Sequence, residues 1–115
     1  MDLLKHETNV EHHPRGRVLV QQGSPGDRMY VLREGEAEIR VGEQVVERVG
    51  PGGFFGEMSL VDHGPRSASV VAVTDVTVVP IDERRFQRMV QETPGFAVHV
   101  FRELVRRLRR ADARL

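Results

Sequence analysis

The stretch Gly52-Gly53-Phe54-Phe55-Gly56-Glu57-Met58-Ser59-Leu60, followed after five residues by Arg66-Ser67-Ala68, is the most informative part of the sequence. Its glycines, next to a short helix start, expose backbone N–H groups that form a natural binding site for an anion. Arg66 can place its planar guanidinium group on a phosphate. Glu57 would repel that phosphate and is better matched to a neutral hydroxyl donor such as a ribose 2′-OH. A ligand with one negative charge and an adjacent sugar hydroxyl therefore satisfies both side chains.

The segments on both sides of this stretch have the composition and spacing of β-strands. In residues 36–41 the apolar side chains of Ala37, Ile39 and Val41 alternate with charged ones, which is typical of a strand with one wet face. Gly42-Glu43 is a candidate two-residue hairpin turn. Short strands at this spacing indicate an antiparallel sandwich or jelly roll. The predicted strands lie at residues 17–22, 28–34, 36–41, 44–49, 66–73 and 76–82.

The period of the apolar residues changes to that of a helix after residue 82. Residues 83–91 place Phe86, Met89 and Val90 on one side of a predicted helix. A second helix is predicted over residues 94–113, with Pro94 in its first turn. Its apolar residues form one continuous stripe, which we expect to pack on the strands. The residues of this stripe are Ala97, Phe101, Leu104, Leu108 and Ala111.

The charge balance limits the class of protein. The 115 residues fit one domain, and 17 basic side chains balance 17 acidic ones. A net charge of zero argues against a general binder of nucleic acid or of an anionic membrane, because both need a surplus of Lys and Arg. The balance conceals a division, since residues 1–83 contain 8 basic and 14 acidic side chains, whereas residues 84–115 contain 9 basic and 3 acidic ones.

Two further absences in the sequence exclude several classes of protein. The chain has no cysteine, which excludes a disulfide scaffold, a thiolate metal site and a cysteine nucleophile. No run without a charged residue exceeds nine positions, which excludes a transmembrane helix and a signal-peptide core. We therefore expect a cytoplasmic protein.

The run Phe55-Gly56-Glu57-Met58-Ser59-Leu60 with Pro65-Arg66-Ser67-Ala68 resembles the phosphate-binding cassette of the cyclic-nucleotide-binding domain family. That family includes the bacterial catabolite activator, the regulatory subunit of cAMP-dependent protein kinase and cyclic-nucleotide-gated channels. The similarity extends to Gly23 and Gly26-Asp27 in the first turn, residues 29–32 and Gly35 in the next strand, Gly50-Pro51-Gly52 before the cassette, and Phe86.

The resemblance implies the fold of the whole chain. It implies one cyclic nucleotide-binding domain over residues 1–115, mainly β with C-terminal helices. An antiparallel β-roll, of the double-stranded β-helix or jelly-roll type, would span residues 17–82 and contain the cassette. The helices would follow at about residues 83–91 and 94–113.

The resemblance also implies a role for each residue of the cassette. Glu57 accepts a hydrogen bond from the ribose 2′-OH and Arg66 pairs with the cyclic phosphate, while Gly56 and the N–H groups of residues 57–59 line the pocket. Ser67 resembles a position whose hydroxyl or N–H also meets the phosphate, and Ala68 keeps the wall of the pocket small. The implied ligand-binding residues are Phe55, Gly56, Glu57, Met58, Ser59, Arg66, Ser67 and Ala68.

In this family the last helix covers the base of the ligand. The residues that resemble this lid are Phe101, Leu104, Val105 and Leu108, and an arginine from residues 106–110 could stack on the purine. Residues 95–115 contain no Ser, Thr, Asn or Gln. The hydroxyl that contacts the adenine amino group in the catabolite activator therefore has no counterpart, and we expect cAMP first and cGMP second as the ligand.

The expected function is that of a sensor without enzymatic activity, which binds the cyclic nucleotide unaltered and transmits its presence through the last helix. No cofactor and no metal are expected, and neither is direct contact with nucleic acid or a membrane. The stripe of the last helix has a heptad-like spacing that permits a homodimer. An unidentified effector protein is the other candidate partner.

Three alternatives stay open at this point. Glu57 and Arg66 can form an internal ion pair in a roll that binds no ligand and acts as an interaction or dimerisation module. The chain can also be the sensor half of a transcription regulator lacking its DNA-binding domain, because no helix-turn-helix follows the last predicted helix. A cupin-type metalloenzyme needs converging imidazoles, whereas His12, His13, His63 and His99 include no His-x-His pair.

Overall fold

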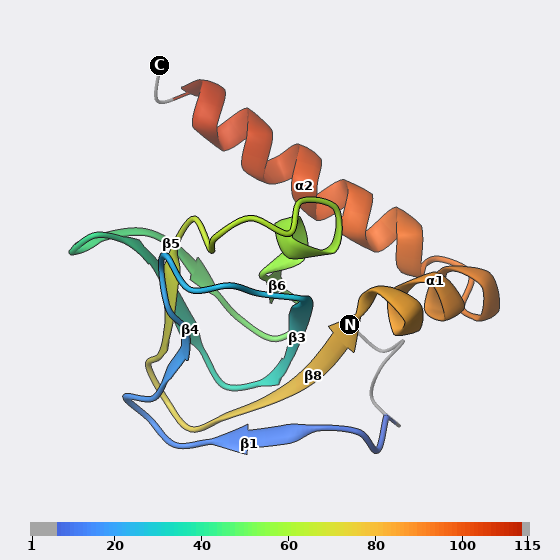
Figure 1. Cartoon of the computed structure of the whole chain (residues 1–115), viewed down its shortest axis with the longest axis horizontal. Helices are drawn as coiled ribbons and strands as arrows, with labels where there is room; N and C mark the ends of the chain where they lie inside the picture. The colour runs from blue at the N-terminus through green and yellow to red at the C-terminus, as the bar shows by residue number, and fades with distance from the viewer. Residues whose placement is uncertain (1–6, 114–115) are drawn as a thin grey trace. The chain divides into compact units, whose positions relative to one another are not determined.

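The fold is mainly antiparallel β with two C-terminal helices, as predicted (Figure 1). The computed structural model describes the backbone of residues 7–113 and the side chains of residues 7–110. By its internal contacts the chain divides into two compact units, residues 1–83 and residues 84–115. The elements are, in order, β1 (Glu11–His13), β2 (Val18–Val20), β3 (Arg28–Glu34), β4 (Ala37–Val41), β5 (Gln44–Val49), β6 (Phe54–Phe55), the 3-10 helix η2 (Glu57–Leu60), β7 (Ser69–Ala72), β8 (Val76–Asp82), α1 (Glu83–Glu92) and α2 (Phe96–Ala113).

Two four-stranded sheets make up the first unit. Their strand orders are β1-β8-β3-β6 and β2-β7-β4-β5, and all neighbours are antiparallel. The hairpin between β4 and β5 closes with Val41 opposite Gln44. Gly42 in its turn has a φ of 61°, a region that glycine adopts without the steric cost of a Cβ. The predicted two-residue hairpin is therefore confirmed.

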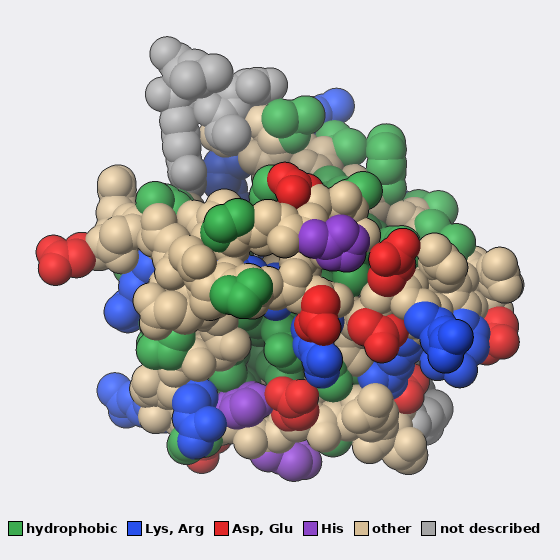
Figure 2. Space-filling model, viewed as in Figure 1, with side chains coloured by type: hydrophobic (Ala, Val, Ile, Leu, Met, Phe, Trp, Pro, Cys, Tyr) green, Lys and Arg blue, Asp and Glu red, His purple; other side chains and the backbone are tan. Residues whose placement is uncertain are grey.

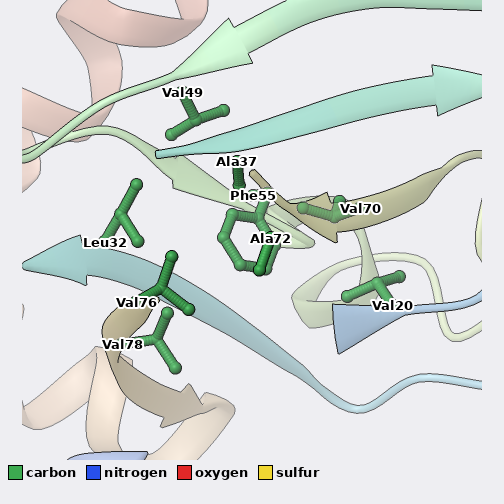
Figure 3. Packing of buried hydrophobic residues seen from close by; sticks show 9 residues of the cluster. All are labelled: Val20, Leu32, Ala37, Val49, Phe55, Val70, Ala72, Val76 and Val78. Carbon is green, nitrogen blue, oxygen red and sulfur yellow. The ribbon is translucent and has the colours of Figure 1, made fainter. Parts of the chain in front are cut away.

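Apolar side chains from both sheets meet in one core. Phe55 is almost fully buried there and stacks on Tyr30, with ring centroids 5.4 Å apart. Burial of a side chain of this size contributes about 1.5–3 kcal/mol. Phe55 thereby fixes the start of the cassette, which continues at Gly56. The cluster consists of Val20, Leu32, Ala37, Val49, Phe55, Val70, Ala72, Val76 and Val78, whose side chains point toward one another in Figure 3.

The second unit consists of α1 and α2. The rings of Phe86 and Phe96 meet edge to face within it, with centroids 5.5 Å apart. The prediction that Pro94 starts the second helix is wrong, because α2 begins only at Phe96. Gly95 has a φ of 94°, which is incompatible with a right-handed helix and places Pro94 in the preceding turn.

The apolar stripe predicted on the second helix is exposed as far as the structure describes its side chains, up to Leu108. Phe101 is 69% and Leu108 64% exposed, and Leu104 is exposed as well. Among the described side chains of α2, the buried apolar ones are Phe96 and Val100, which lie one turn apart beside the stripe. Within the second unit, the contact of Phe96 with Phe86 buries the start of α2. The expected packing of the stripe on the strands concerns both units and stays a prediction.

The first strand was not predicted, because the roll was expected to begin at residue 17. β1 pairs with β8 in the register Glu11 to Val78 and His13 to Val76. Its three residues are polar and show no apolar alternation, so only the pairing with β8 defines it. None of the helices within residues 7–113 is long and apolar enough to cross a membrane.

Candidate anion-binding site

Arg66 lies in a loop that backbone hydrogen bonds fix on both sides. Its N–H donates to the carbonyl of Ser24 at 2.8 Å, and its carbonyl accepts from the N–H of Gly23 at 2.9 Å. The neighbouring Pro65 pairs with Pro25 in an isolated antiparallel bridge. The strand predicted from residue 66 therefore begins later, in β7, and Arg66 is held against the turn that follows β2.

The side chain of Arg66 passes close to two glycines. A Cβ at Gly26 would lie 2.0 Å from Arg66 Nε, and a Cβ at Gly56 would lie 2.7 Å from Nη1. Gly56 also has a φ of 79°, in the left-handed region that other residues rarely adopt. Both glycines are therefore required for the position of the guanidinium.

Three neutral oxygen atoms hold this guanidinium. Nη1 donates to the carbonyl of Gly56 at 3.1 Å and to Oγ of Ser59 at 3.0 Å, and Nη2 donates to the carbonyl of Arg28 at 2.9 Å. Since every nitrogen of a guanidinium has N–H groups, the Nε–H and one Nη2–H are left without an acceptor among the described residues. Two such donors on one guanidinium can bind two oxygens of the same anion.

Arg66 forms no ion pair with a carboxylate of the described residues. None of the ion pairs found within the described part of the chain includes Arg66. An internal ion pair between Glu57 and Arg66, considered above as an alternative, is therefore not the arrangement in the structure. A fixed, partly buried guanidinium with free donors attracts an anion.

The cassette continues from Gly56 into η2, which confirms the predicted short helix start. The N–H of Ser59 donates to the carbonyl of Gly56 at 3.3 Å, and the N–H of Asp62 donates to the carbonyl of Met58 at 2.8 Å. Glu57 is the first residue of η2 and is half-buried. The Ser59 N–H bond to Gly56 lies in the first turn of the helix.

The remaining cassette residues fall into two groups. Met58 is exposed, and its Sδ lies 4.0 Å from Oγ of Ser67, so the two halves of the cassette lie next to each other. Ala68 is half-buried. The side chain of Phe55 belongs to the core, and any contact of Phe55 with a ligand would be made by its backbone.

Asp27 is an acidic residue in the turn that holds Arg66. Its Oδ1 accepts a hydrogen bond from Nε of Arg28 at 3.1 Å. This bond lowers the pKa of the Asp27 carboxyl below its ordinary value, and the charges of Arg28 and Arg66 add to the effect. Asp27 is therefore in direct contact with Arg28, and its carboxylate acts on Arg66 only through space, without an ion-pair contact.

The residues proposed as a lid belong to the second unit. Phe101, Leu104 and Leu108 are exposed and Val105 is half-buried. Exposed apolar side chains of this kind are available for contact with an apolar partner such as a purine ring. Their role at the site stays a prediction.

The residue types of Gly26 and Arg28 do not by themselves predict a role at the site. Arg28 contributes only its backbone carbonyl, and a carbonyl leaves no signal in the residue type. Gly26 appeared only among the glycines of the family resemblance. The residue type of Gly26 still contains a signal, because a glycine in a turn often marks a place where another group approaches the backbone closely.

Two of the histidines considered as metal ligands, His12 and His13, have partners of other kinds. Nδ1 of His12 lies 3.0 Å from Oγ1 of Thr77, and Nε2 of His13 lies 2.9 Å from Oε1 of Glu11. Both histidines line a cavity of about 430 Å³ next to the end of β3. Among the described residues, no three His, Asp or Glu side chains gather closely enough to hold a metal ion.

Comparisons with known proteins show what this chain is similar to. The family model described as cyclic nucleotide-binding domain matches residues 10–93. The chain is 33% identical over 109 residues to a CRP-like cAMP-activated global transcriptional regulator of Mycobacterium tuberculosis, with 89% of this chain and 48% of that protein covered. It is 38% identical over 88 residues to a cAMP-dependent protein kinase regulatory subunit of Colletotrichum orbiculare, with 75% and 22% covered.

A solved structure shows the same fold. The catabolite activator protein of Thermus thermophilus superposes with a TM-score of 0.79 at 30% sequence identity, covering 99% of this chain and 61% of that chain. The chain spans about half the length of the mycobacterial regulator and less than a quarter of the kinase subunit.

Proposed function

Because the chain belongs to the cyclic nucleotide-binding domain family, we propose that it is a sensor module for cAMP, with cGMP as the second candidate ligand. The observation that supports this proposal most is the set of hydrogen bonds that the Arg66 side chain makes. Its guanidinium is fixed by three neutral oxygens, has no carboxylate partner and retains two free donors among the described residues. A cyclic phosphate has one negative charge and exocyclic oxygens that match these donors.

In this proposal the two halves of the cassette bind different parts of the ligand. Arg66 pairs with the cyclic phosphate, and the first N–H groups of η2 and the Ser67 hydroxyl or N–H add to this contact. Glu57 accepts a hydrogen bond from the ribose 2′-OH. The contact between Met58 and Ser67 supports the division, because it brings the two halves to one place.

The proposed output is conformational. The exposed side chains of Phe101, Leu104 and Leu108 would cover the base together with Val105, so that a bound nucleotide favours the capped state of the last helix. Cyclic nucleotide would be bound without chemical change. The receiver would be a second copy of the chain, joined through the last helix, or an effector protein.

The proposal of cAMP rests on the relatives. The mycobacterial regulator is described as cAMP-activated and the fungal kinase subunit as cAMP-dependent. Residues 95–115 of this chain contain no hydroxyl or amide side chain, so the base would be selected by apolar contact and stacking. Such contacts discriminate weakly between purines, which keeps cGMP as the second candidate.

Calorimetric titration of the chain with cAMP and with cGMP tests the proposal. We expect binding of cAMP at micromolar concentration or below, with weaker binding of cGMP. If neither nucleotide produces heat at these concentrations, the chain is a roll that binds no cyclic nucleotide. 5′-AMP is the matched control ligand, since its dianionic open phosphate differs from the cyclic one, and we expect it to bind far more weakly.

A further inference from the structure

The hydroxyl of Ser59 lies at the centre of the contacts around Arg66. Only 4% of Ser59 is exposed. Its Oγ lies 3.0 Å from Nη1 of Arg66, 2.8 Å from the carbonyl oxygen of Gly56 and 3.0 Å from the carbonyl oxygen of Arg28. One buried oxygen therefore connects the two halves of the cassette, at Gly56 and Arg66, with Arg28, which lies 31 residues before Ser59.

The hydrogen-bonding capacity of a hydroxyl defines what this oxygen does. A hydroxyl has a single proton, so Ser59 donates to one of the two carbonyls and accepts from Nη1 of Arg66. The carbonyl of Gly56 already receives the N–H of Ser59 and the other N–H of Nη1. Ser59 thus supplies the second acceptor of Nη1 and ties it to the turn that begins β3.

We propose that the side chain of Ser59 is a positioning residue, which fixes the Arg66 guanidinium without neutralising its charge. A carboxylate in this place would also fix the guanidinium, but it would compensate the positive charge that an anion needs. A fixed guanidinium has less side-chain freedom to lose when a ligand binds, which favours affinity. The predicted effect on nucleotide affinity rests on the proposed function, whereas the effect on Arg66 itself does not.

The effect of Ser59 passes through Arg66 rather than through a direct contact with ligand. Oγ has three protein partners at hydrogen-bond distance, and its burial leaves almost no surface for a ligand. The position therefore differs from that of Ser67, whose exposed side chain faces solvent.

The ordering of the Nε–H group of Arg66 in the protein without nucleotide tests the inference. In ¹H–¹⁵N relaxation measurements we expect this group to be as rigid as the neighbouring backbone in the wild type, and clearly more mobile in Ser59→Ala. Ser24→Ala is the matched control, because Oγ of Ser24 donates to the carbonyl three residues before it, that of Gln21, and does not touch Arg66. Equal rigidity in the wild type and in Ser59→Ala overturns the inference.

A second variant separates the loss of the hydrogen bond from a disturbance of the fold. Ser59→Cys fills nearly the same space but offers only a weak acceptor, so we expect it to mobilise Arg66 as Ser59→Ala does. Thermal unfolding and the backbone amide spectrum show which variants keep the native fold. The mobility of the Arg66 Nε–H group is then compared among the variants that keep it. If Ser59→Cys keeps Arg66 as rigid as the wild type, the hydroxyl is not what fixes it and the inference is wrong.

Affinity for cAMP provides the second readout. We expect Ser59→Ala and Ser59→Cys to bind about tenfold more weakly, the effect of losing one hydrogen bond to a charged group, and Ser24→Ala to bind like the wild type. If the wild type binds no nucleotide, the proposed function fails while the relaxation result still decides the role of Ser59. Unchanged affinity in both Ser59 variants, with cAMP bound by the wild type, contradicts the inference.

Discussion

The arginines of the first unit differ in the charge of the groups that they contact, as a comparison of Arg40 and Arg48 with Arg66 shows. Arg40 donates through Nη2 to Oε2 of Glu38 at 2.7 Å, and Arg48 donates to the other oxygen of Glu38 at 3.0 Å. Arg66 instead donates only to two carbonyls and a hydroxyl. The difference lies in the group that accepts the hydrogen bonds of the arginine. A carboxylate neutralises the positive charge of the arginine, whereas a carbonyl or hydroxyl oxygen does not, so that the charge can still attract an anionic ligand.

The paired type of arginine is common on the surface. Figure 2 shows basic and acidic side chains lying next to one another on the face in view. Such pairs contribute little to stability because water and salt screen them. A cluster of arginines in the sequence is therefore a poor indicator of a site, whereas a single arginine among glycines in the cassette is a better one.

The largest expected effect separates these two groups directly. Arg66→Ala should weaken cAMP binding roughly a thousandfold, since it leaves a largely desolvated anion without its counter-charge at a cost of about 3–5 kcal/mol. Arg40→Ala, the matched control, should bind like the wild type. Calorimetry measures both. An equal loss of cAMP affinity in the two variants would show that the groups around each arginine do not determine its contribution to binding.

A smaller effect is expected when Arg66 is kept but displaced. In Gly26→Ala the new methyl group would lie 2.0 Å from Nε, so the guanidinium must leave its three oxygens. We expect affinity to fall by about a hundredfold, as when a charge-assisted hydrogen bond of about 2–3 kcal/mol is lost.

Gly50→Ala is the matched control for this variant, because its Cβ would meet nothing within 4 Å. It should leave the cAMP affinity unchanged, and both variants should keep the amide spectrum of the fold. Wild-type affinity in Gly26→Ala would mean that the observed position of Arg66 is not the binding position.

The smallest expected effect concerns the paired arginines. The hydrogen bond from Arg40, together with Arg48, lowers the pKa of Glu38 below its ordinary value of 4.5. The ion pairs therefore stabilise the fold above that pH, and the stabilisation is lost as the pH falls through the lowered pKa. Glu38→Gln should lower Tm slightly at pH 7, and the difference from the wild type should disappear in acid. A difference that persists at pH 3 would contradict this account.

Residue types were enough to propose the candidate site and to predict one turn of the fold. The glycines, Glu57 and Arg66 of the cassette predicted an anion site, and the Gly42-Glu43 turn predicted the β4–β5 hairpin that the structure confirms. Each of these features depends on a few neighbouring residues, whose types can be read from the sequence.

The features that were missed depend on contacts between distant segments. β1 is a strand only because β8 lies beside it, and the buried face of α2 follows from the contact between Phe96 and Phe86. The partners of Arg66 are mainly backbone carbonyls, and any residue at position 28 would offer one. Residue types alone therefore indicate which arginine to propose as the partner of a phosphate, but not which atoms hold its side chain.

The most direct test of the free charge on Arg66 is the ¹H–¹⁵N signal of its Nε–H during titration with cAMP and, separately, with adenosine, which lacks the phosphate. We predict that cAMP shifts this signal strongly and slows its exchange with water, while adenosine leaves it unchanged and the Nε–H signals of Arg40 and Arg48 stay in place with both ligands. Binding of cAMP without a change in the Arg66 signal would contradict the account.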